Sequence, residues 1–305
     1  MTERSLTILS CGSAKPTESQ TPSSQLLRLR DKEYMIDCGE GAQLHMAHLH
    51  ILPPHRLGHI FISHLHGDHC LGLIGFLSTL GMMDRTSTLY IHAPSPAKRL
   101  FQPMVDFFCA GNGFDIVIEE IDTRHHVLVY EDNTVSVSTI PLKHSVPTCG
   151  YLFEEKPTLR HYLREVGDAY GISTAYIPGI KAGADYTMPD GTVIPNSKLT
   201  TDPKPPFRYA YCSDTAYYEK IIPIIEEVDC LYHEATYISA DIEKARKHNH
   251  STAAQAAEIA KLARVKELII GHFSSRYKDI KPILDEARAV FSNTRLATAE
   301  TKIEF

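Results

Sequence analysis

Histidines and an aspartate crowd one short run of the chain, the residues His64-Leu65-His66-Gly67-Asp68-His69. An apolar stretch with the composition of a buried strand, Ile60-Phe61-Ile62, comes directly before this run. Side chains two positions apart in an extended chain point to the same side, so His64 and His66 can bind one metal ion. The first half of the run therefore predicts a metal site at the end of a strand.

The second half of the run provides ligands for another ion. Gly67 permits a tight backbone that turns Asp68 and His69 away from the first pair and toward a second metal. Imidazole and carboxylate ligands suit zinc, and manganese and iron also accept them. A histidine-rich surface loop is the simpler interpretation, but the order of strand, loop and helix favours a metal site.

Three more candidate ligands each follow a stretch with strand character. They are His144 after Thr134–Pro141, Asp214 after Arg208–Cys212, and His272 after Glu267–Ile270. A single histidine or aspartate after a strand is often only structural. Three such residues, in a chain that already has the histidine run, favour a two-metal centre.

The elements that must position these ligands occur in two similar halves, each with a run of strands followed by helices. This order is typical of an α/β protein built as an αββα sandwich, with two mixed sheets flanked by helices. Ser251–Ala263 has strong helical spacing, with Ser251 as its expected N-cap. Helices are also predicted for Leu71–Leu80, Lys98–Phe108, Thr158–Tyr170, Tyr218–Val228 and Ile280–Phe291.

We interpret residues 1–305 as a single domain that carries an insertion arm at about residues 154–206. The arm interrupts the sandwich pattern with a high density of prolines, at positions 157, 178, 189, 195, 203, 205 and 206. Basic residues and tyrosines alternate along it. Such a segment can contact phosphates, although a solvated charged face explains the same pattern.

The composition limits the classes of protein. The net charge of −6 argues against a chain that binds nucleic acid over its whole surface, so a phosphate-rich partner must bind a local patch. The chain contains no apolar run of about 18 residues that could span a membrane. The seven cysteines are scattered and form no CxxC pair. We therefore expect a cytoplasmic protein without a disulfide framework.

Longer motifs resemble the ribonuclease Z family of the metallo-β-lactamase superfamily. Residues 37–43 (DCGEGAQ) resemble the family's DCGEGTQ segment, and residues 61–69 (FISHLHGDH) resemble its FITHLHGDH. Three further blocks match its HEAT, HST and SSRY segments, at residues 233–236, 250–252 and 272–277. These blocks run in the family's order over nearly the whole chain. The histidine run alone marks only the superfamily, whereas the last three blocks are more specific.

The resemblance implies a metallo-β-lactamase fold with two Zn²⁺ ions per subunit. It implies that His64, His66 and His144 hold one zinc, that Asp68, His69 and His272 hold the other, and that Asp214 bridges them. The implied reaction is removal of the 3′ trailer from precursor tRNA by an endoribonuclease, which leaves a 3′-hydroxyl on the tRNA. The implied assembly is a homodimer in which the arm of one subunit serves the site of the other.

Roles outside the metal ligands also follow from the resemblance. Asp68 is expected to accept a proton from the attacking water, and Glu234 and His250 are expected to move a proton to the leaving oxygen. The simpler interpretation is that Glu234 caps a following helix and that His250 begins one. Ser274 and Arg276 are expected near the phosphate, although Arg276 could equally form a surface ion pair.

Departures from the family pattern affect substrate contacts. Ala42 replaces the threonine of the GTQ segment, and the arm has only Ile177-Pro178-Gly179-Ile180 where relatives carry a glycine–proline motif. His45, His48 and His50 are interpreted as a group on a helix surface, because no second run of ligands accompanies them.

Two alternative functions remain open at the level of the sequence. One is a phosphodiesterase or hydrolase that uses the same two zinc ions on small molecules, which the altered arm and the negative charge favour. The other is a catalytically inactive RNA-binding relative, which the presence of all seven candidate ligands disfavours.

Overall fold

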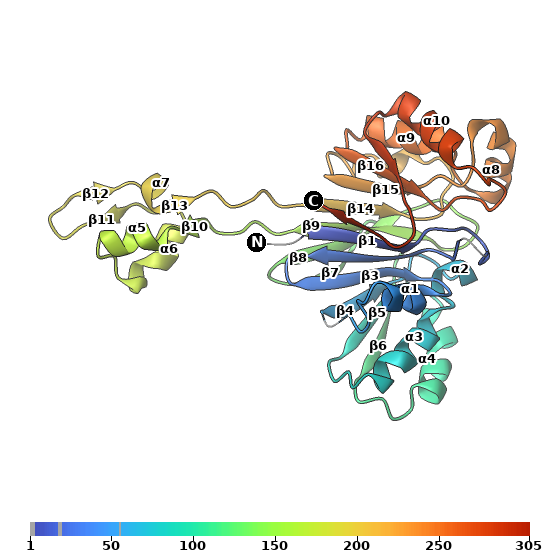
Figure 1. Cartoon of the computed structure of the whole chain (residues 1–305), viewed down its shortest axis with the longest axis horizontal. Coiled ribbons are helices and arrows are strands. Elements are labelled where there is room, and N and C mark those ends of the chain that lie inside the picture. Colours follow the sequence, from blue (N-terminus) through green and yellow to red (C-terminus); the bar gives the residue numbers. More distant parts are fainter. Residues whose placement is uncertain (1–3, 18–19, 55) are drawn as a thin grey trace. The chain divides into compact units, whose positions relative to one another are not determined.

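The computed structural model describes residues 4–17, 20–54 and 56–305. Over these residues, two sheets of seven strands lie face to face, with helices on the outer side of each (Figure 1). Each sheet and each helix thereby buries one apolar face, which is the physical basis of layered folds. The predicted αββα sandwich is confirmed.

The first sheet carries the histidine run after its fourth strand in chain order. Its β3 (Lys32–Cys38), β4 (Leu57–Phe61), β5 (Leu89–Pro94) and β6 (Ile116–Ile121) are parallel neighbours. The other side of β3 is antiparallel: β2 (Ser24–Leu29), β1 (Arg4–Ser10) and then β18 (Thr301–Glu304). The carboxyl ends of the parallel strands meet at one edge, where the ligand-bearing loops begin.

The second sheet carries the later ligands in the same way. Its order is β17 (Thr294–Leu296), β16 (Glu267–Gly271), β15 (Cys230–Glu234), β14 (Arg208–Cys212), β9 (Cys149–Glu155), β8 (Val135–Pro141) and β7 (Leu128–Glu131). Strands β14 to β17 are parallel, and β9 pairs with β14 in the antiparallel direction. Asp214 and His272 therefore follow strands that end on the same side of the sheet.

Aromatic side chains fill the space between the two sheets. Tyr34 of the first sheet lies 5.6 Å from Phe153 of the second, measured between ring centroids, and Phe61 lies 5.1 Å from Tyr151. Two tyrosines of the second sheet also donate hydrogen bonds across this layer, Tyr209 to Gln25 Oε1 at 2.6 Å and Tyr211 to Asp37 Oδ2 at 2.7 Å. Ring packing and these hydrogen bonds together hold the two sheets against each other.

Helices close the outer faces. On the first sheet these are α1 (Ala42–His48), α3 (Leu73–Met82) and α4 (Ala97–Phe108), and on the second they are α9 (Ala253–Leu262) and α10 (Lys281–Val290) (Figure 1). The helix α3 buries Leu73, Phe76, Leu77 and Leu80, spaced as one helical face requires. No helix in the described ranges is long and apolar enough to cross a bilayer.

Two helix predictions are wrong in part. Within Tyr218–Val228, the structure has only a 3-10 helix, Glu219–Ile221, because Pro223 follows and cannot donate a backbone hydrogen bond. Within Thr158–Tyr170, only α5 (Arg164–Ala169) is helical, and His161–Tyr162 forms the short strand β10 instead.

The predicted N-cap of α9 is also wrong, by one residue. Thr252 is the N-cap, and its side chain accepts a hydrogen bond from Gln255 N at 3.2 Å while the Gln255 side chain accepts from Thr252 N. This reciprocal arrangement is a capping box. Ser251 lies one residue earlier, and its hydroxyl donates to the Thr215 carbonyl at 2.7 Å.

The residues divide into two compact units, and the smaller one is Glu155–Phe207. Its small apolar core contains Ile172, Ile180, Tyr186, Ile194 and Leu199. Its elements are β10 (His161–Tyr162), α5, η1 (Thr174–Tyr176), α6 (Ile177–Lys181), β11 (Tyr186–Thr187), β12 (Val193–Ile194), α7 (Asn196–Leu199) and β13 (Thr200–Thr201). Glu154 and Arg208, at the ends of β9 and β14, are antiparallel partners in the larger unit.

Candidate metal centre and active site

The seven candidate ligands all lie just past strands of the sandwich or in the short helix α2 (Gly67–Cys70). They are His64 and His66 after β4, Asp68 and His69 in α2, His144 after β8, Asp214 after β14, and His272 after β16. Both sheets thus contribute, and the structure brings together every ligand proposed from the sequence.

One group of ligand atoms surrounds a first point. His64 Nε2 lies 3.1 Å from His66 Nδ1, which lies 3.3 Å from His144 Nε2. Asp214 Oδ2 lies 3.8 Å from the Nε2 atoms of both His64 and His144. Three imidazoles and one carboxylate oxygen therefore converge, which is a common donor set for zinc.

The second group uses the other oxygen of the same aspartate. Asp214 Oδ1 lies 3.4 Å from His69 Nε2 and 3.2 Å from His272 Nε2. Asp68 Oδ2 lies 3.7 Å from His69 Nε2 and 3.5 Å from His272 Nε2. Asp214 stands between the two groups, with one oxygen in each, which is the geometry that a bridging ligand needs.

Buried polar atoms in the second group show that it is built for a cation. His69 Nε2, His272 Nε2 and Asp214 Oδ1 are buried and have no hydrogen-bond partner among the described residues. A buried polar atom without a partner costs about 1–3 kcal/mol, and three of them facing one point are costly unless a ligand satisfies them. Divalent metal ions fit this donor set and remove that cost.

Hydrogen bonds on the outer edges of the imidazoles fix their tautomers. The contacts are His69 Nδ1 to Asp37 Oδ2 at 2.7 Å, His272 Nδ1 to Thr236 Oγ1 at 2.9 Å, and His144 Nδ1 to the Asn249 carbonyl at 2.9 Å. With its Nδ1–H donated outward, each ring presents the Nε2 lone pair to the metal position. Such partners orient metal ligands and raise their basicity.

Asp37, the first residue of the segment 37–43, is a buried outer partner of the candidate metal centre that its sequence motif did not predict. Its side chain also accepts hydrogen bonds from Ser63 N at 2.7 Å and from the Tyr211 hydroxyl at 2.7 Å, so it ties both sheets to His69. Its φ of 55° lies in the left-handed region, as does the φ of 60° at His272. Strained backbone of this kind is concentrated at functional sites.

The turn of α2 depends on two glycines outside the histidine run. A Cβ atom on Gly72 would lie 2.2 Å from the Gly39 carbonyl oxygen, and one on Gly39 would lie 2.7 Å from the Asp68 carbonyl oxygen. Gly67 does not have a positive φ, and a Cβ atom there would lie 2.7 Å from Cδ1 of the Leu71 side chain rather than against backbone. The close approach of α2 to the loop after β3 therefore requires Gly39 and Gly72.

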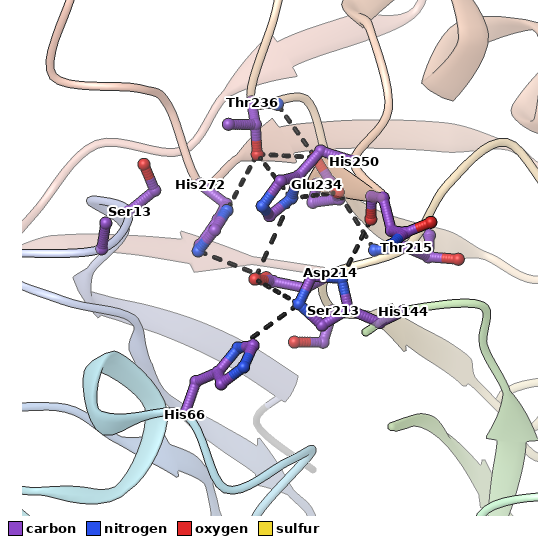
Figure 2. A network of polar contacts seen from close by, with 12 residues as sticks. Ser13, His66, His144, Ser213, Asp214, Thr215, Glu234, Thr236, His250 and His272 are labelled. Carbon is purple, nitrogen blue, oxygen red and sulfur yellow. Dashed lines mark hydrogen bonds and ion pairs between the residues drawn. The ribbon is translucent and has the colours of Figure 1, made fainter. Parts of the chain in front are cut away.

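Glu234 and His250 form a pair beside the metal position (Figure 2). His250 Nδ1 lies 2.8 Å from Glu234 Oε1, and it lies 3.9 Å from Asp214 Oδ2. Glu234 is fully buried and accepts hydrogen bonds from Thr215 N, Thr236 N and Ser251 N at 3.0 to 3.1 Å. Glu234 ends a strand and caps no helix, so the simpler interpretation of this residue is wrong.

The electrostatics of this pair favour an ion pair. Burial disfavours the charged imidazole, but the charge and hydrogen bond of Glu234 outweigh it and raise the pKa of His250 to about 9. Burial likewise opposes ionisation of Glu234, and His250 outweighs it and lowers the pKa of the Glu234 carboxyl. His250 also groups with Asp214 and His272 at metal-binding spacing, but the Glu234 contact occupies its Nδ1.

The metal position opens into a cleft of about 590 Å³, lined by Ala14, Asp68, Tyr237, Ser274, Ser275 and Arg276 among others. Arg276 Nε donates to Ser274 Oγ at 3.2 Å, and its guanidinium lies over the Tyr237 ring, 5.2 Å from the centroid. Ser274 and Arg276, which the family resemblance places near the phosphate, both lie in the wall of this cleft.

The fold and the paired ligand groups define a protein of the metallo-β-lactamase fold with a candidate two-metal site. Human tRNase Z, short form, superposes with a TM-score of 0.71 at 24% identity, covering 98% of each chain. The metallo-β-lactamase fold protein YhfI from Bacillus subtilis gives 0.69 at 18% identity, covering 99% of this chain and 100% of YhfI. At these identities the likeness establishes the fold alone.

Sequence comparison establishes the family. The chain is 51% identical over 302 residues to ribonuclease Z of Porphyromonas gingivalis, covering 98% of both chains. It is 51% identical over 296 residues to ribonuclease Z of Parabacteroides distasonis, covering 97% of both. A family model described as "Anti-Pycsar protein Apyc1" matches residues 4–105. The chain belongs to the ribonuclease Z family, and it is a hydrolase that acts as an endoribonuclease.

Proposed function

We propose that this chain removes the 3′ trailer from precursor tRNA and leaves a 3′-hydroxyl on the tRNA body. The observation that carries the proposal is the convergence of seven ligands into two groups that share Asp214, in a chain that is about half identical to ribonuclease Z over its full length. The small-molecule phosphodiesterase is not favoured, because the relatives that match nearly the whole chain are ribonucleases.

The proposed cofactor is a pair of Zn²⁺ ions, one held by His64, His66, His144 and Asp214, and the other by Asp68, His69, His272 and Asp214. When bound, such ions would polarise a phosphodiester and lower the pKa of a coordinated water molecule. Asp68 faces the second group with Oδ2, while Ala14 N donates to the same oxygen at 2.7 Å. This contact holds the carboxylate where it can accept the proton of the attacking water.

Glu234 and His250 are proposed to serve the leaving group. Glu234 holds the Nδ1 edge of the ring, and the ion pair keeps the imidazole protonated at neutral pH. The Nε2 edge is then the proton donor for the 3′ oxygen that leaves phosphorus. Glu234 acts through His250, so it positions and charges the acid rather than touching the substrate.

Ser274 and Arg276 are proposed to bind the phosphates next to the scissile bond. The guanidinium is anchored by the Ser274 hydroxyl and the Tyr237 ring, which limits its freedom before substrate binds. The arm is proposed to bind the tRNA away from the cut. Two of its cations already have acidic partners, Arg160 with Asp202 and Arg164 with Asp168, so Lys181, Lys198 and Lys204 are the better candidates for phosphate contacts.

A homodimer is proposed from exposed apolar side chains on the first sheet's helical layer. Met82, Phe107 and Phe108 are 75%, 77% and 56% exposed. Exposed apolar groups of this size mark interaction surfaces. Light scattering after gel filtration tests the dimer: a Phe107→Glu variant should run as a monomer.

A cytoplasmic location is proposed because all seven cysteines are free and buried, as in a reducing compartment.

Cleavage of a precursor tRNA with a 3′ trailer tests the function, with bis-p-nitrophenyl phosphate as the comparison substrate. Zinc-loaded protein should cut the tRNA once, after the discriminator base. Hydrolysis of the small ester with no cut in the tRNA would overturn the proposal and return the function to a small-molecule phosphodiesterase.

A further inference from the structure

A second cluster of histidines lies on α1, apart from the seven ligands of the metal centre. His45 and His48 are three positions apart on this helix, so both side chains lie on one face. No acidic residue lies within four positions of either histidine in the sequence. The structure brings one from the far end of the chain, because Glu300, between β17 and β18, lies against the same helical face.

Both histidine side chains contact the same oxygen atom of Glu300. His45 Nδ1 lies 2.7 Å from Glu300 Oε1, and His48 Nδ1 lies 3.0 Å from the same atom. The side chain of His45 is 16% exposed, that of Glu300 is 38% exposed, and that of His48 is 66% exposed. The cluster is thus anchored on its inner side by His45 and open to solvent at His48.

The hydrogen bonds around His45 determine which nitrogen carries its proton. Thr21 Oγ1 donates to Ser10 Oγ at 2.6 Å, and Ser10 Oγ in turn donates to the Thr21 carbonyl. Thr21 Oγ1 has therefore given away its proton, and it must accept from His45 Nε2, which lies 2.6 Å away. A neutral His45 then has its Nδ1 lone pair pointed at the Glu300 carboxylate, an acceptor facing an acceptor.

We propose that His45, His48 and Glu300 form a third zinc site, separate from the catalytic pair. Two imidazole nitrogens and one carboxylate oxygen are zinc ligands, and a water completes a tetrahedral set. Zinc–ligand distances of about 2.0–2.2 Å require ligand atoms about 3.3 Å apart, which the exposed ends of His48 and Glu300 can reach by small rotations. Thr21 supplies the outer hydrogen bond that orients a metal-binding histidine.

The site joins two parts of the chain that are distant in sequence. His45 and His48 belong to the helix that follows β3, and Glu300 immediately precedes the last strand, β18. β18 is the edge strand of the first sheet and pairs only with β1 among the described strands. Zinc bound here would hold the carboxyl-terminal strand onto the sheet, which is a structural role that the proposed tRNA cleavage does not require.

Metal content per chain tests the proposal. Wild type, His48→Gln and His50→Gln are dialysed against the same chelator-buffered zinc and analysed by mass spectrometry. His48 is exposed, so its replacement leaves the core intact, and His50 is an exposed histidine two positions away that serves as the matched control. His48→Gln should hold one zinc fewer than wild type, and His50→Gln should hold the same amount.

Equal zinc content in all three proteins would overturn the third site. Because the result is a difference between variants, it does not depend on how much metal the catalytic centre holds. A failure of that centre would lower all three counts equally. As a second readout, Glu300→Gln should lose part of the rise in melting temperature that zinc gives wild type, and an unchanged rise would contradict the proposed link.

Discussion

His250 Nδ1 lies 2.8 Å from Glu234 Oε1, in a pair that is closed off from solvent on the glutamate side. Figure 2 shows that Thr236 adjoins both residues and His272 as well, so the Glu234–His250 pair and a candidate metal ligand share one hydrogen-bond network. The charge state of His250 is therefore coupled to the geometry of the metal centre.

The pH profile of cleavage should report this pair. The pKa of His250 is raised to about 9, so the imidazolium persists at neutral pH and is lost as the pH rises through about 9. If His250 is the general acid, kcat falls on that basic limb. Glu234→Gln removes the stabilising charge, so its basic limb should move to lower pH. A limb at the same pH in the variant would contradict the assignment, and the melting temperature serves as a folding control.

Asp68→Ala should abolish turnover while tRNA binding survives. The variant loses both a ligand of the second group and the proposed proton acceptor, and we expect kcat to fall by at least about 10³-fold. Single-turnover cleavage measures the chemistry, and a filter-binding assay measures affinity for the precursor. Activity near the wild-type level would show that the proposed mechanism is wrong.

Removal of metal should destabilise the fold. Without cations, the buried Nε2 atoms of His69 and His272 and Oδ1 of Asp214 have no hydrogen-bond partner in the described part of the chain. Zinc binds the native state in preference to the unfolded chain, and a concentration 100 times the Kd would stabilise it by about 2.7 kcal/mol. Chelation should lower the melting temperature and zinc should restore it. In Asp214→Ala, which lacks the shared ligand, added zinc should restore much less of the melting temperature than it restores in wild type.

Arg276→Ala should weaken substrate binding more than it slows the chemical step. Loss of one phosphate contact should raise KM and reduce the slope of log affinity against log salt by about one. Steady-state kinetics at several salt concentrations measure both quantities. Arg276→Lys keeps the charge but loses the fixed position over Tyr237. Its KM and its salt slope should therefore lie between those of wild type and Arg276→Ala. An unchanged salt slope in Arg276→Ala would show that Arg276 makes no phosphate contact and serves as a surface ion-pair residue.

Much of the metal centre could be predicted because its ligands are tied to strand ends, which have a clear sequence pattern. His144, Asp214 and His272 are far apart in sequence, yet each follows a strand whose end faces the same edge. The outer partners could not be predicted in the same way. The Asn249 carbonyl that orients His144 is a backbone group, which any residue could supply.

Other predictions failed because helical spacing alone does not fix where a helix begins or ends. Pro223 interrupts the helical spacing of Tyr218–Val228, and Ser251 and Thr252 are both favoured N-cap residue types. The close crossing of Gly39 and Gly72 joins segments that local patterns treat separately. The meeting of His45 with Glu300 spans 255 positions, and no pattern in the sequence predicts it.

The base of the Glu155–Phe207 unit has an evolutionary consequence. The chain leaves at Glu154 and returns at Arg208, two residues paired side by side and joined by a hydrogen bond of 2.8 Å. The segment between them can gain, lose or exchange residues without disturbing the Glu154–Arg208 pair. The strand β14, which leads to Asp214, then stays in place as well. Under the proposed role of the arm in tRNA binding, lineages can therefore change how they bind RNA while they keep the proposed catalytic residues.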